Sequence, residues 1–453
     1  MSEEYDYGEY YYTSEELPSH YYMFYYCIIP SFQQANGFVL PVIIACFLFR
    51  SITQTYYYAE NIKHFISAAT GLVVLFYVFE SLSFHIFKLI IGLSILFYLF
   101  NILYRKTRGP IISIICFIIL VLTELSSDNE QWPRIRGVEM LIVMKIISLA
   151  FDLDSGIVKE FPNMTSYFGY ILCPGNVVFG PWVSFNVYRK IFVNPLWNSK
   201  WLQEIVISII KTLIVFTISA CCIDSIFFSM NNSQTKWVSM YQNALQYRTS
   251  HYFISFLSEA TSLLAGFGSQ SDGSWKISVA QLQYIELPRS LVQVVVSWNL
   301  SMHQWLKQYI FNSSRSLGGF LSVTLTYIVS SFLHGLNYRL AGVLMSLGFY
   351  TYIEYTLRAK LSSKFNACIA ARPCPLHCNH RFTKTSLAVK IFNAVCSILT
   401  IFHLAYLGCL MNTNEIEATT FSLAFKKWVD LSFISHWIAF LTYVLYIISK
   451  LTM

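Results

Sequence analysis

The chain of 453 residues has the composition of a multi-pass membrane protein. Apolar residues make up 55% of it and charged residues 12%, whereas soluble proteins carry about 25% charged residues. This balance excludes a soluble enzyme, a disordered chain and a small disulfide-stabilised scaffold. The net charge of +7 is better explained by basic cytoplasmic loops than by a nucleic-acid surface, so we expect no nucleic-acid partner.

Apolar stretches that suit membrane spans recur along the whole sequence. With the doubtful ones set aside, they predict an all-α fold, a transmembrane helical bundle of about eleven spans with additional re-entrant or interfacial helices. The thirteen stretches are 38–50, 66–84, 86–104, 111–126, 138–151, 166–187, 203–229, 250–267, 289–311, 317–337, 340–357, 387–411 and 432–449.

Two of these stretches are unusual. The stretch 138–151 is short and contains Lys145, which suggests a re-entrant or interfacial helix. The stretch 166–187 is interrupted at Cys173–Gly175 and again at Phe179–Pro181. Interrupted helices occur at membrane depth only where protein buries them or where they line a cavity, so we expect one of these two settings for this segment.

The charge distribution predicts how the chain is oriented. Residues 1–16 contain six acidic residues and no lysine or arginine, so we expect an acidic, tyrosine-rich head over residues 1–37 on the lumenal side. The basic clusters Arg105–Arg108 and Arg358–Lys390 are expected in the cytosol by the positive-inside rule. No repeat or low-complexity linker is visible, so residues 38–453 are predicted to form a single membrane domain.

The eleven cysteines do not suggest a disulfide framework. Several lie in apolar runs, where free cysteine is ordinarily a small hydrophobic residue. These are Cys46, Cys116, Cys221, Cys222, Cys396 and Cys409. We expect them to be free thiols.

A separate group of cysteines lies in the basic stretch near residue 370. Cys368, Cys374 and Cys378 occur with His377 and His380 within 13 residues. Thiolates and imidazoles at this density can bind zinc tetrahedrally, although the spacing matches no standard zinc finger. A metal clip, a disulfide and free thiols are therefore open alternatives.

His334 is the outstanding candidate for a catalytic residue. It lies near the end of the apolar run Thr324–Gly335, which contains no Asp, Glu, Lys or Arg. Titratable groups inside membrane spans are costly and by default indicate a functional site. The alternative is an interfacial histidine that is hydrogen-bonded to a neighbouring helix.

Two further polar residues precede His334. Asn299 lies in the largely apolar stretch Val294–Met302, and its amide can donate and accept hydrogen bonds at once. Three roles are open for Asn299. It takes part in the reaction, it joins two helices by hydrogen bonds, or it carries a glycan in the sequon Asn299–Ser301. Arg289 lies just before the same stretch, and its guanidinium either binds an anion such as phosphate or anchors the helix at the membrane interface.

Several short motifs occur in a characteristic order and spacing. A polar Asn299 is followed 35 residues later by His334 on an apolar helix. The others, over most of residues 136–437, are Arg136–Met140, Phe151–Asp154, Phe179–Trp182, Phe256–Thr261, Glu286–Ser290, Phe332–Gly335 and Ile401–Gly408. Together they resemble the membrane-bound O-acyltransferase family and, more narrowly, those members that transfer palmitoleate to a serine of Wnt proteins.

This resemblance implies an enzyme of the endoplasmic-reticulum membrane whose spans surround an acyl-transfer tunnel. Acyl-CoA, here palmitoleoyl-CoA, enters from the cytosol, and the Wnt protein reaches the same centre from the lumen. His334 is then the catalytic histidine and Asn299 a second polar residue, while Trp298 and Arg289 are expected to contact acyl-CoA. Besides acyl-CoA as co-substrate and membrane lipid as surroundings, we expect no required cofactor, because thioester-to-ester transfer is not uphill.

The candidate residues suit this chemistry. Histidine has an ordinary pKa of about 6.5, close to the pH at which a general base must work, and an amide such as that of Asn299 can stabilise a developing oxyanion. The alternative is a non-enzymatic transporter or a lipid or protein chaperone. Transporters often contain internal repeats and paired broken helices, whereas one interrupted segment and no repeat are obvious here, which favours the enzyme.

Overall fold

The structure is a computed structural model that describes residues 23–55, 58–103, 106–127, 131–193, 198–228, 235–375, 377–411 and 425–451. These residues form helices and no β-strand, apart from two isolated bridges, so the predicted all-α fold class is confirmed. The longer helices are α2 Ile29–Thr55, α3 Glu60–Phe79, α4 Ser83–Leu103, α5 Arg108–Ser126, α6 Trp132–Asp154, α9 Ser199–Thr217, α11 Lys236–Leu264, α15 Gly319–Leu333, α16 Tyr338–Phe365, α17 Leu387–Gly408 and α20 Ile434–Leu451. The shorter ones are η1 Met23–Ile28, η2 Glu80–Leu82, α7 Met164–Ile171, α8 Phe185–Lys190, η3 Ile218–Cys222, α10 Ile223–Phe228, α12 Leu282–Glu286, α13 Leu291–Trp298, α14 Leu300–Trp305, η5 Leu306–Phe311, η6 Arg315–Leu317, η7 Cys409–Met411 and α19 Lys426–Asp430.

Six helical stretches among the described residues are long and apolar enough to cross a membrane. They are Met23–Gln54, Glu60–Asn101, Arg108–Ser126, Ser199–Phe227, Leu387–Met411 and Ile434–Leu451, and Gly319–Leu333 is a shorter apolar helix. The protein is therefore a multi-pass helical membrane protein. The total of about eleven spans stays a prediction.

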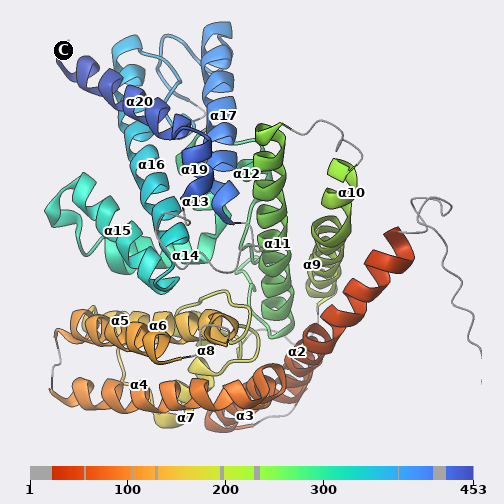
Figure 1. Cartoon of the computed structure of the whole chain (residues 1–453). Coiled ribbons are helices and arrows are strands. Elements are labelled where there is room, and N and C mark those ends of the chain that lie inside the picture. The colour runs from red at the N-terminus through yellow and green to blue at the C-terminus, as the bar shows by residue number, and fades with distance from the viewer. Residues whose placement is uncertain are drawn as a thin grey trace, which may run out of the picture.

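The helices form two groups (Figure 1). Helices α2 to α7 lie in the lower part of that view, whereas α16, α17 and α20 lie in the upper part, and α14 and α15 lie between them. Within these groups α3 packs on α7, α5 on α6 and α16 on α20, while α11 contacts both α9 and α17. The largest buried apolar cluster includes most of α6, so this helix lies at the centre of the lower group.

Helix α6 corrects one prediction. The apolar stretch 138–151 was expected to be a short re-entrant or interfacial helix, but it lies inside a continuous helix of 23 residues. Such a helix is about 34 Å long, enough to cross the apolar layer of a bilayer. Every residue from Leu141 to Ala150 is buried, so α6 is covered by protein and the prediction of a short helix is wrong.

The interrupted segment 166–187 is confirmed and lies in the interior. Helix α7 ends at Ile171, α8 begins at Phe185, and most of the residues between them are buried. The ammonium of Lys145 on α6 donates to the carbonyl oxygens of Tyr170 and Ile171 at 3.0 and 2.9 Å. It also donates to Oδ1 of Asn176 at 2.7 Å. Lys145 thus satisfies backbone groups that the end of α7 leaves unpaired.

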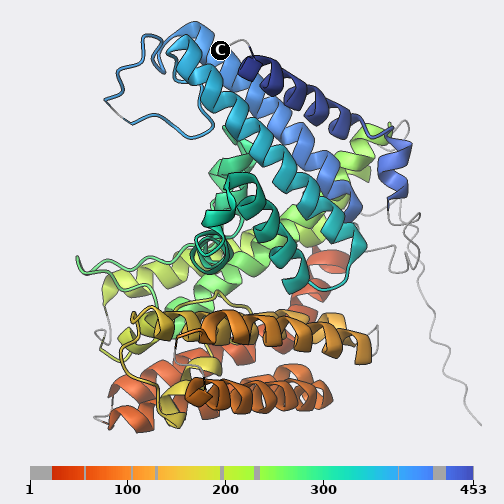
Figure 2. The same cartoon turned by 90° about the vertical axis from the view of Figure 1, so that its left-hand side faces the viewer.

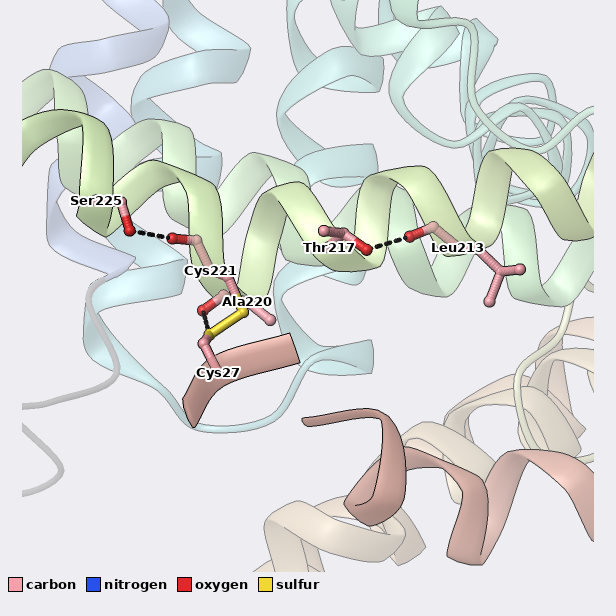
Figure 3. The surroundings of a disulfide bond; sticks show 6 residues. All are labelled: Cys27, Leu213, Thr217, Ala220, Cys221 and Ser225. Carbon is pink, nitrogen blue, oxygen red and sulfur yellow. Dashed lines mark hydrogen bonds between the residues drawn. A yellow bond between two sulfur atoms is a disulfide. The ribbon is translucent and has the colours of Figure 1, made fainter. Parts of the chain in front are cut away.

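A disulfide joins Cys27 to Cys221, which corrects the expectation that Cys221 is a free thiol. Figure 3 shows this bond between η1, at the start of the described chain, and η3, the π-helical turn that follows α9. The other five cysteines of the apolar runs are free, as expected. The pairing was not visible in the sequence because the partners are 194 residues apart.

The two segments that were predicted on opposite sides of the membrane, the head 1–37 and the basic stretch Arg358–Lys390, lie apart in the part of the chain that the structure describes. Figure 2 shows the loop 366–386 between α16 and α17 on the left, and the start of α2 with α10 on the right. Of the predicted head, residues 1–22 lie outside the described residues, and residues 23–37 belong to η1 and α2.

Candidate active site

The predicted apolar segment 289–311 is interrupted at Asn299. Helix α13 ends at Trp298, and α14 begins at Leu300, because Asn299 adopts an extended conformation with φ −149° and ψ 94°. Its side-chain Oδ1 accepts a hydrogen bond from the backbone N–H of Met302 at 2.9 Å. Asparagine is among the preferred residues for capping a helix in this way, so Asn299 both ends one helix and begins the next.

A neighbouring segment satisfies the backbone at this interruption. The carbonyl oxygen of Val279 accepts from the N–H of Leu300 at 2.8 Å, and the N–H of Gln281 donates to the carbonyl oxygen of Ser297 at 2.9 Å. Glu259 on α11 holds this segment, since its Oε1 accepts from the N–H of Val279 at 2.6 Å. The break between α13 and α14 is therefore stabilised by hydrogen bonds to the segment around Val279.

His334 lies at the C-terminal end of α15, where its backbone N–H donates to the carbonyl oxygens of Ser330 and Ser331 at 3.3 and 3.1 Å. Gly335 follows in a left-handed conformation with φ +85°. A Cβ atom at Gly335 would lie 2.5 Å from the ring of Trp132 and 2.9 Å from the carboxylate of Glu124. The same carboxylate accepts from the N–H of Leu336 at 2.8 Å, so glycine is required for this turn to pack on α5 and α6.

The side chain of His334 is half-buried and has no hydrogen-bond partner within the described part of the chain. Arg136 on α6 and His251 on α11 are close enough to interact electrostatically with its imidazole. Nε2 of His251 and Nη2 of Arg136 are themselves buried, and neither finds a partner among the described residues. We call His334, His251 and Arg136 the unpaired cluster.

Trp298 connects the unpaired cluster to Asn299. The indole of Trp298 stacks on the imidazole of His251 with ring centroids 5.0 Å apart and an interplanar angle of 19°. Asn299 is the next residue, although no direct contact between Asn299 and His334 is found among the described residues. The one described hydrogen bond of the Asn299 side chain uses Oδ1. Its Nδ2 donor has no partner among the described residues.

Two buried histidines elsewhere in the described helices, His64 and His403, are paired. Nδ1 of His64 lies 2.8 Å from the hydroxyl of Tyr188, and Nδ1 of His403 lies 2.6 Å from the hydroxyl of Ser435. Most buried polar groups in folded proteins are paired in this way. Buried atoms without a described partner also occur elsewhere, such as the indole nitrogen of Trp275 and Oδ2 of Asp152, but around His334 several lie together, which makes this region a candidate site.

His251 and Arg136 were missed as candidate residues. Arg136 belongs to the motif Arg136–Met140, which contributed to the family resemblance but did not by itself indicate a site residue. His251 stands near the start of the predicted span 250–267, so the rule that singled out His334 also applied to it.

Arg289 lies apart from the unpaired cluster, just before α13. Its Nε donates to the carbonyl oxygen of Ala370 at 3.1 Å, and its Nη2 donates to that of Cys368 at 2.7 Å. The side chain is half-buried. Arg289 therefore ties α13 to the loop 366–386, and two of its nitrogens are occupied in doing so.

The same loop brings four of the predicted metal ligands together. The ligand atoms of Cys368, Cys374, Cys378 and His380 all lie within 4.8 Å of one another. His377 is exposed and does not belong to this group, so its inclusion among the candidate ligands is not supported. Hydrogen bonding to His380 holds the pKa of the Cys378 thiol below its usual value.

Comparison with known proteins finds a matching family and several similar sequences. The sequence model of MBOAT, the membrane-bound O-acyltransferase family, matches residues 26–370. The human protein-serine O-palmitoleoyltransferase porcupine is 34% identical over 449 residues, which cover 93% of this chain and 96% of the human protein. The Anopheles gambiae protein of the same name is 33% identical over 460 residues, with 93% of this chain and 92% of that protein covered. Lysophospholipid acyltransferase 2 of Arabidopsis thaliana is 24% identical over 290 residues, with 52% and 60% covered.

Proposed function

Since the chain belongs to the membrane-bound O-acyltransferase family, we propose that it transfers a palmitoleoyl group from acyl-CoA to a serine hydroxyl of a secreted protein of the Wnt type. The names of relatives that align over most of both chains support the acyl group and the accepting serine. The Wnt partner rests on the resemblance of the motifs described above.

The unpaired cluster is the observation that carries this proposal. A half-buried imidazole without a hydrogen-bond partner is free to accept a proton from a substrate hydroxyl. Two buried nitrogen atoms beside it also lack partners among the described residues. Leaving such groups unpaired costs stability, and a bound substrate would remove that cost.

Each step of the transfer can be assigned to residues of this chain. The imidazole of His334 takes the proton of the serine hydroxyl while the serine oxygen attacks the thioester carbonyl carbon. The tetrahedral intermediate then breaks its carbon–sulfur bond, and the proton passes from His334 to the leaving CoA thiolate. The free Nδ2 donor of Asn299 stabilises the oxyanion in between. The reaction consumes no ATP and changes no oxidation state.

Trp298 and Arg289 are the proposed acyl-CoA contacts. Trp298 is half-buried beside Asn299, so its indole provides an apolar wall next to the reacting thioester. Arg289 lies at the end of α13 that faces the basic loop, with Arg358 close enough to repel it electrostatically. A guanidinium in such surroundings suits a phosphate group of CoA, which it would contact through the nitrogen not used for Ala370 and Cys368.

We place the enzyme in the endoplasmic-reticulum membrane, with the acidic start of the head 1–37 in the lumen. Residues 38–453 belong to the membrane domain, which the helical stretch Met23–Gln54 extends toward the N-terminus. The disulfide between Cys27 and Cys221 supports a lumenal position for the start of α2, because disulfides persist in oxidising compartments. The loop 366–386 lies on the opposite side in Figure 2, and its basic residues support a cytosolic position. Acyl-CoA and the secreted protein would then reach the unpaired cluster from opposite sides.

Acyl transfer by the purified protein tests this function. The full-length protein in detergent would be incubated with labelled palmitoleoyl-CoA and a Wnt-derived peptide, with a matched peptide in which alanine replaces the accepting serine. We expect label on the first peptide alone, which alkali removes and neutral hydroxylamine does not, as for an oxyester. Binding of acyl-CoA without transfer to either peptide would instead support the alternative of a non-enzymatic transporter or chaperone, which family membership does not favour.

A further inference from the structure

The loop 366–386 contains a cluster of metal-ligating side chains that the acyl-transfer mechanism does not use. We propose that Cys368, Cys374, Cys378 and His380 bind one structural zinc ion, which fixes this loop and, through it, the start of α13. Three thiolates and one imidazole form one of the ligand sets found in structural zinc sites.

The distances between ligand atoms fit a tetrahedral zinc site. Zn–S bonds of about 2.3 Å and Zn–N bonds of about 2.05 Å place sulfur atoms about 3.8 Å apart and sulfur and nitrogen about 3.6 Å apart. Sγ of Cys368 lies 3.6 Å, and Sγ of Cys374 lies 3.7 Å, from Nδ1 of His380. Sγ of Cys368 and Sγ of Cys378 are 3.2 Å apart. The two sulfur–nitrogen distances match a tetrahedral site, and the two sulfur atoms would move apart by about 0.6 Å on binding zinc.

The position of the loop favours a metal over a disulfide. Its basic flanks predict a cytosolic location, and cytosolic cysteines are kept reduced, where clusters of this kind more often bind metal. All three thiols are free in the structure. The chain contains one described disulfide, and it lies on the other side of the molecule, near the start of α2.

The loop has little apolar packing of its own. It connects α16 to α17 without regular secondary structure and is longer than most such connections. Its buried apolar cluster has four members, Ala367, Cys368, Ile369 and Val389, of which one is itself a proposed ligand. A metal ion is a common source of stability where the apolar core is this small.

Three side chains connect the ligand loop to the active-site helix. Arg289 donates to the carbonyl oxygens of Cys368 and Ala370, and the hydroxyl of Ser290, which begins α13, donates to that of Ala371 at 2.9 Å. Arg358 on α16 donates to the carbonyl oxygen of Ile369 at 2.8 Å and to that of Arg289 at 2.8 Å. Helix α13 ends at Trp298 and Asn299, so an ordered ligand loop fixes the helix that positions both residues.

Metal analysis of the full-length protein tests the proposal. The wild-type protein, purified without chelators, would be compared with Cys378→Ser, His380→Ala and the matched control His377→Ala, in which an exposed histidine of the same loop is removed. We expect about one zinc per chain in the wild type and the control, as in other four-ligand sites, and loss of most zinc in the other two. Gel filtration would establish that the compared variants are folded.

A measurement on the wild type alone guards against variants that fail to fold. Zinc should be released when a mercurial reagent modifies the thiols. Zinc removal should also speed trypsin cleavage after Arg381 and Lys384, which are exposed in this loop, because the loop would lose its fixed shape. Wild-type protein that contains no zinc and takes none up from solution would overturn the proposal. So would equal zinc in all four proteins, or a disulfide between Cys368 and Cys378 found by mass spectrometry.

Discussion

Two polar centres in the apolar interior differ in how their charged or titratable groups are paired. In the interrupted segment, the ammonium of Lys145 donates three hydrogen bonds to Tyr170, Ile171 and Asn176, although Nδ2 of Asn176 has no described partner. In the unpaired cluster, the imidazole of His334 has no described partner, and the neighbouring nitrogens of His251 and Arg136 have none either.

We propose that this difference separates a structural polar group from a functional one. A buried ammonium that gives all of its protons to fixed acceptors has nothing left for a substrate, so Lys145 stabilises the fold. Unpaired donors and acceptors cost stability and persist where a ligand makes use of them. The two centres should therefore respond in opposite ways to substitution, one in stability and the other in rate.

The largest effect on rate is expected for His334→Ala. Loss of a positioned general base lowers the rate by about 10²- to 10⁴-fold, while protein accumulation in membranes and thermal stability should remain close to wild type, because no hydrogen bond is lost. Rates of transfer from labelled palmitoleoyl-CoA and melting curves of the purified proteins would measure both. Equal losses of protein and of activity would place His334 in the same structural class as Lys145.

The complementary change is Lys145→Met, which keeps the length of the side chain and removes the ammonium. Three buried acceptors lose their donor, so we expect a loss of about 3 kcal/mol in stability. The rate per folded molecule should stay near wild type. A stable Lys145→Met protein with a strongly reduced rate would contradict the comparison, since Lys145 would then act in the reaction.

Asn299 combines both kinds of role, and two substitutions separate them. Asn299→Ser keeps an oxygen that caps α14 about as well but lacks the amide donor, whereas Asn299→Ala loses both. If Nδ2 stabilises the oxyanion, both variants should lose up to about 10²- to 10³-fold in rate, with Asn299→Ser the more stable. Full activity in Asn299→Ser would assign the residue to helix capping alone.

A smaller effect is expected for His251→Phe, which preserves a ring that can stack on Trp298. Both ring nitrogens are lost, and Nε2 is the one that is buried without a described partner. The expected loss of rate is about 2- to 10-fold, the worth of one hydrogen bond. His251→Ala removes the stacked ring as well and should also lower the affinity for acyl-CoA. An unchanged rate in His251→Phe together with a raised melting temperature would show that Nε2 contributes nothing to transfer.

The smallest effect on maximal rate is expected for Arg289→Lys, which keeps the charge but loses the forked geometry. If Arg289 contacts a phosphate of CoA, the apparent acyl-CoA requirement should rise more than the maximal rate falls. Titration with palmitoleoyl-CoA at saturating peptide would measure the two separately. An unchanged requirement would leave Arg289 with its contacts to Ala370 and Cys368 as its whole role.

Part of this site was predictable from the sequence. An isolated histidine in an apolar run and a polar residue upstream were enough to single out His334 and Asn299. The length of α6 was not predictable, because Glu139, Lys145 and Asp152 interrupt its apolar pattern. The partner of Asp152 lies far away in the chain, since the hydroxyl of Tyr309 donates to it at 3.0 Å. Glu139 accepts from the indole N–H of Trp132, at the start of the same helix, at 3.1 Å.

Two other errors also concern contacts that only the folded chain reveals. The sequence placed Cys221 in an apolar run but gave no sign that Cys27 lies beside it. It grouped His377 with the metal ligands, whereas only the folded loop distinguishes the exposed His377 from the gathered His380. Local patterns predict which residue types can do chemistry, and the packing decides which of them meet.

The central claim is that the unpaired cluster binds the reacting thioester. A cryo-electron microscopy structure of the purified protein with a non-hydrolysable palmitoleoyl-CoA analogue tests it most directly. We expect the carbonyl carbon of the analogue beside His334, about 3–3.5 Å from the position that the attacking serine oxygen would occupy. The carbonyl oxygen of the analogue should lie within hydrogen-bonding distance of Nδ2 of Asn299. An analogue bound with its carbonyl away from His334, Asn299 and His251 would contradict the account.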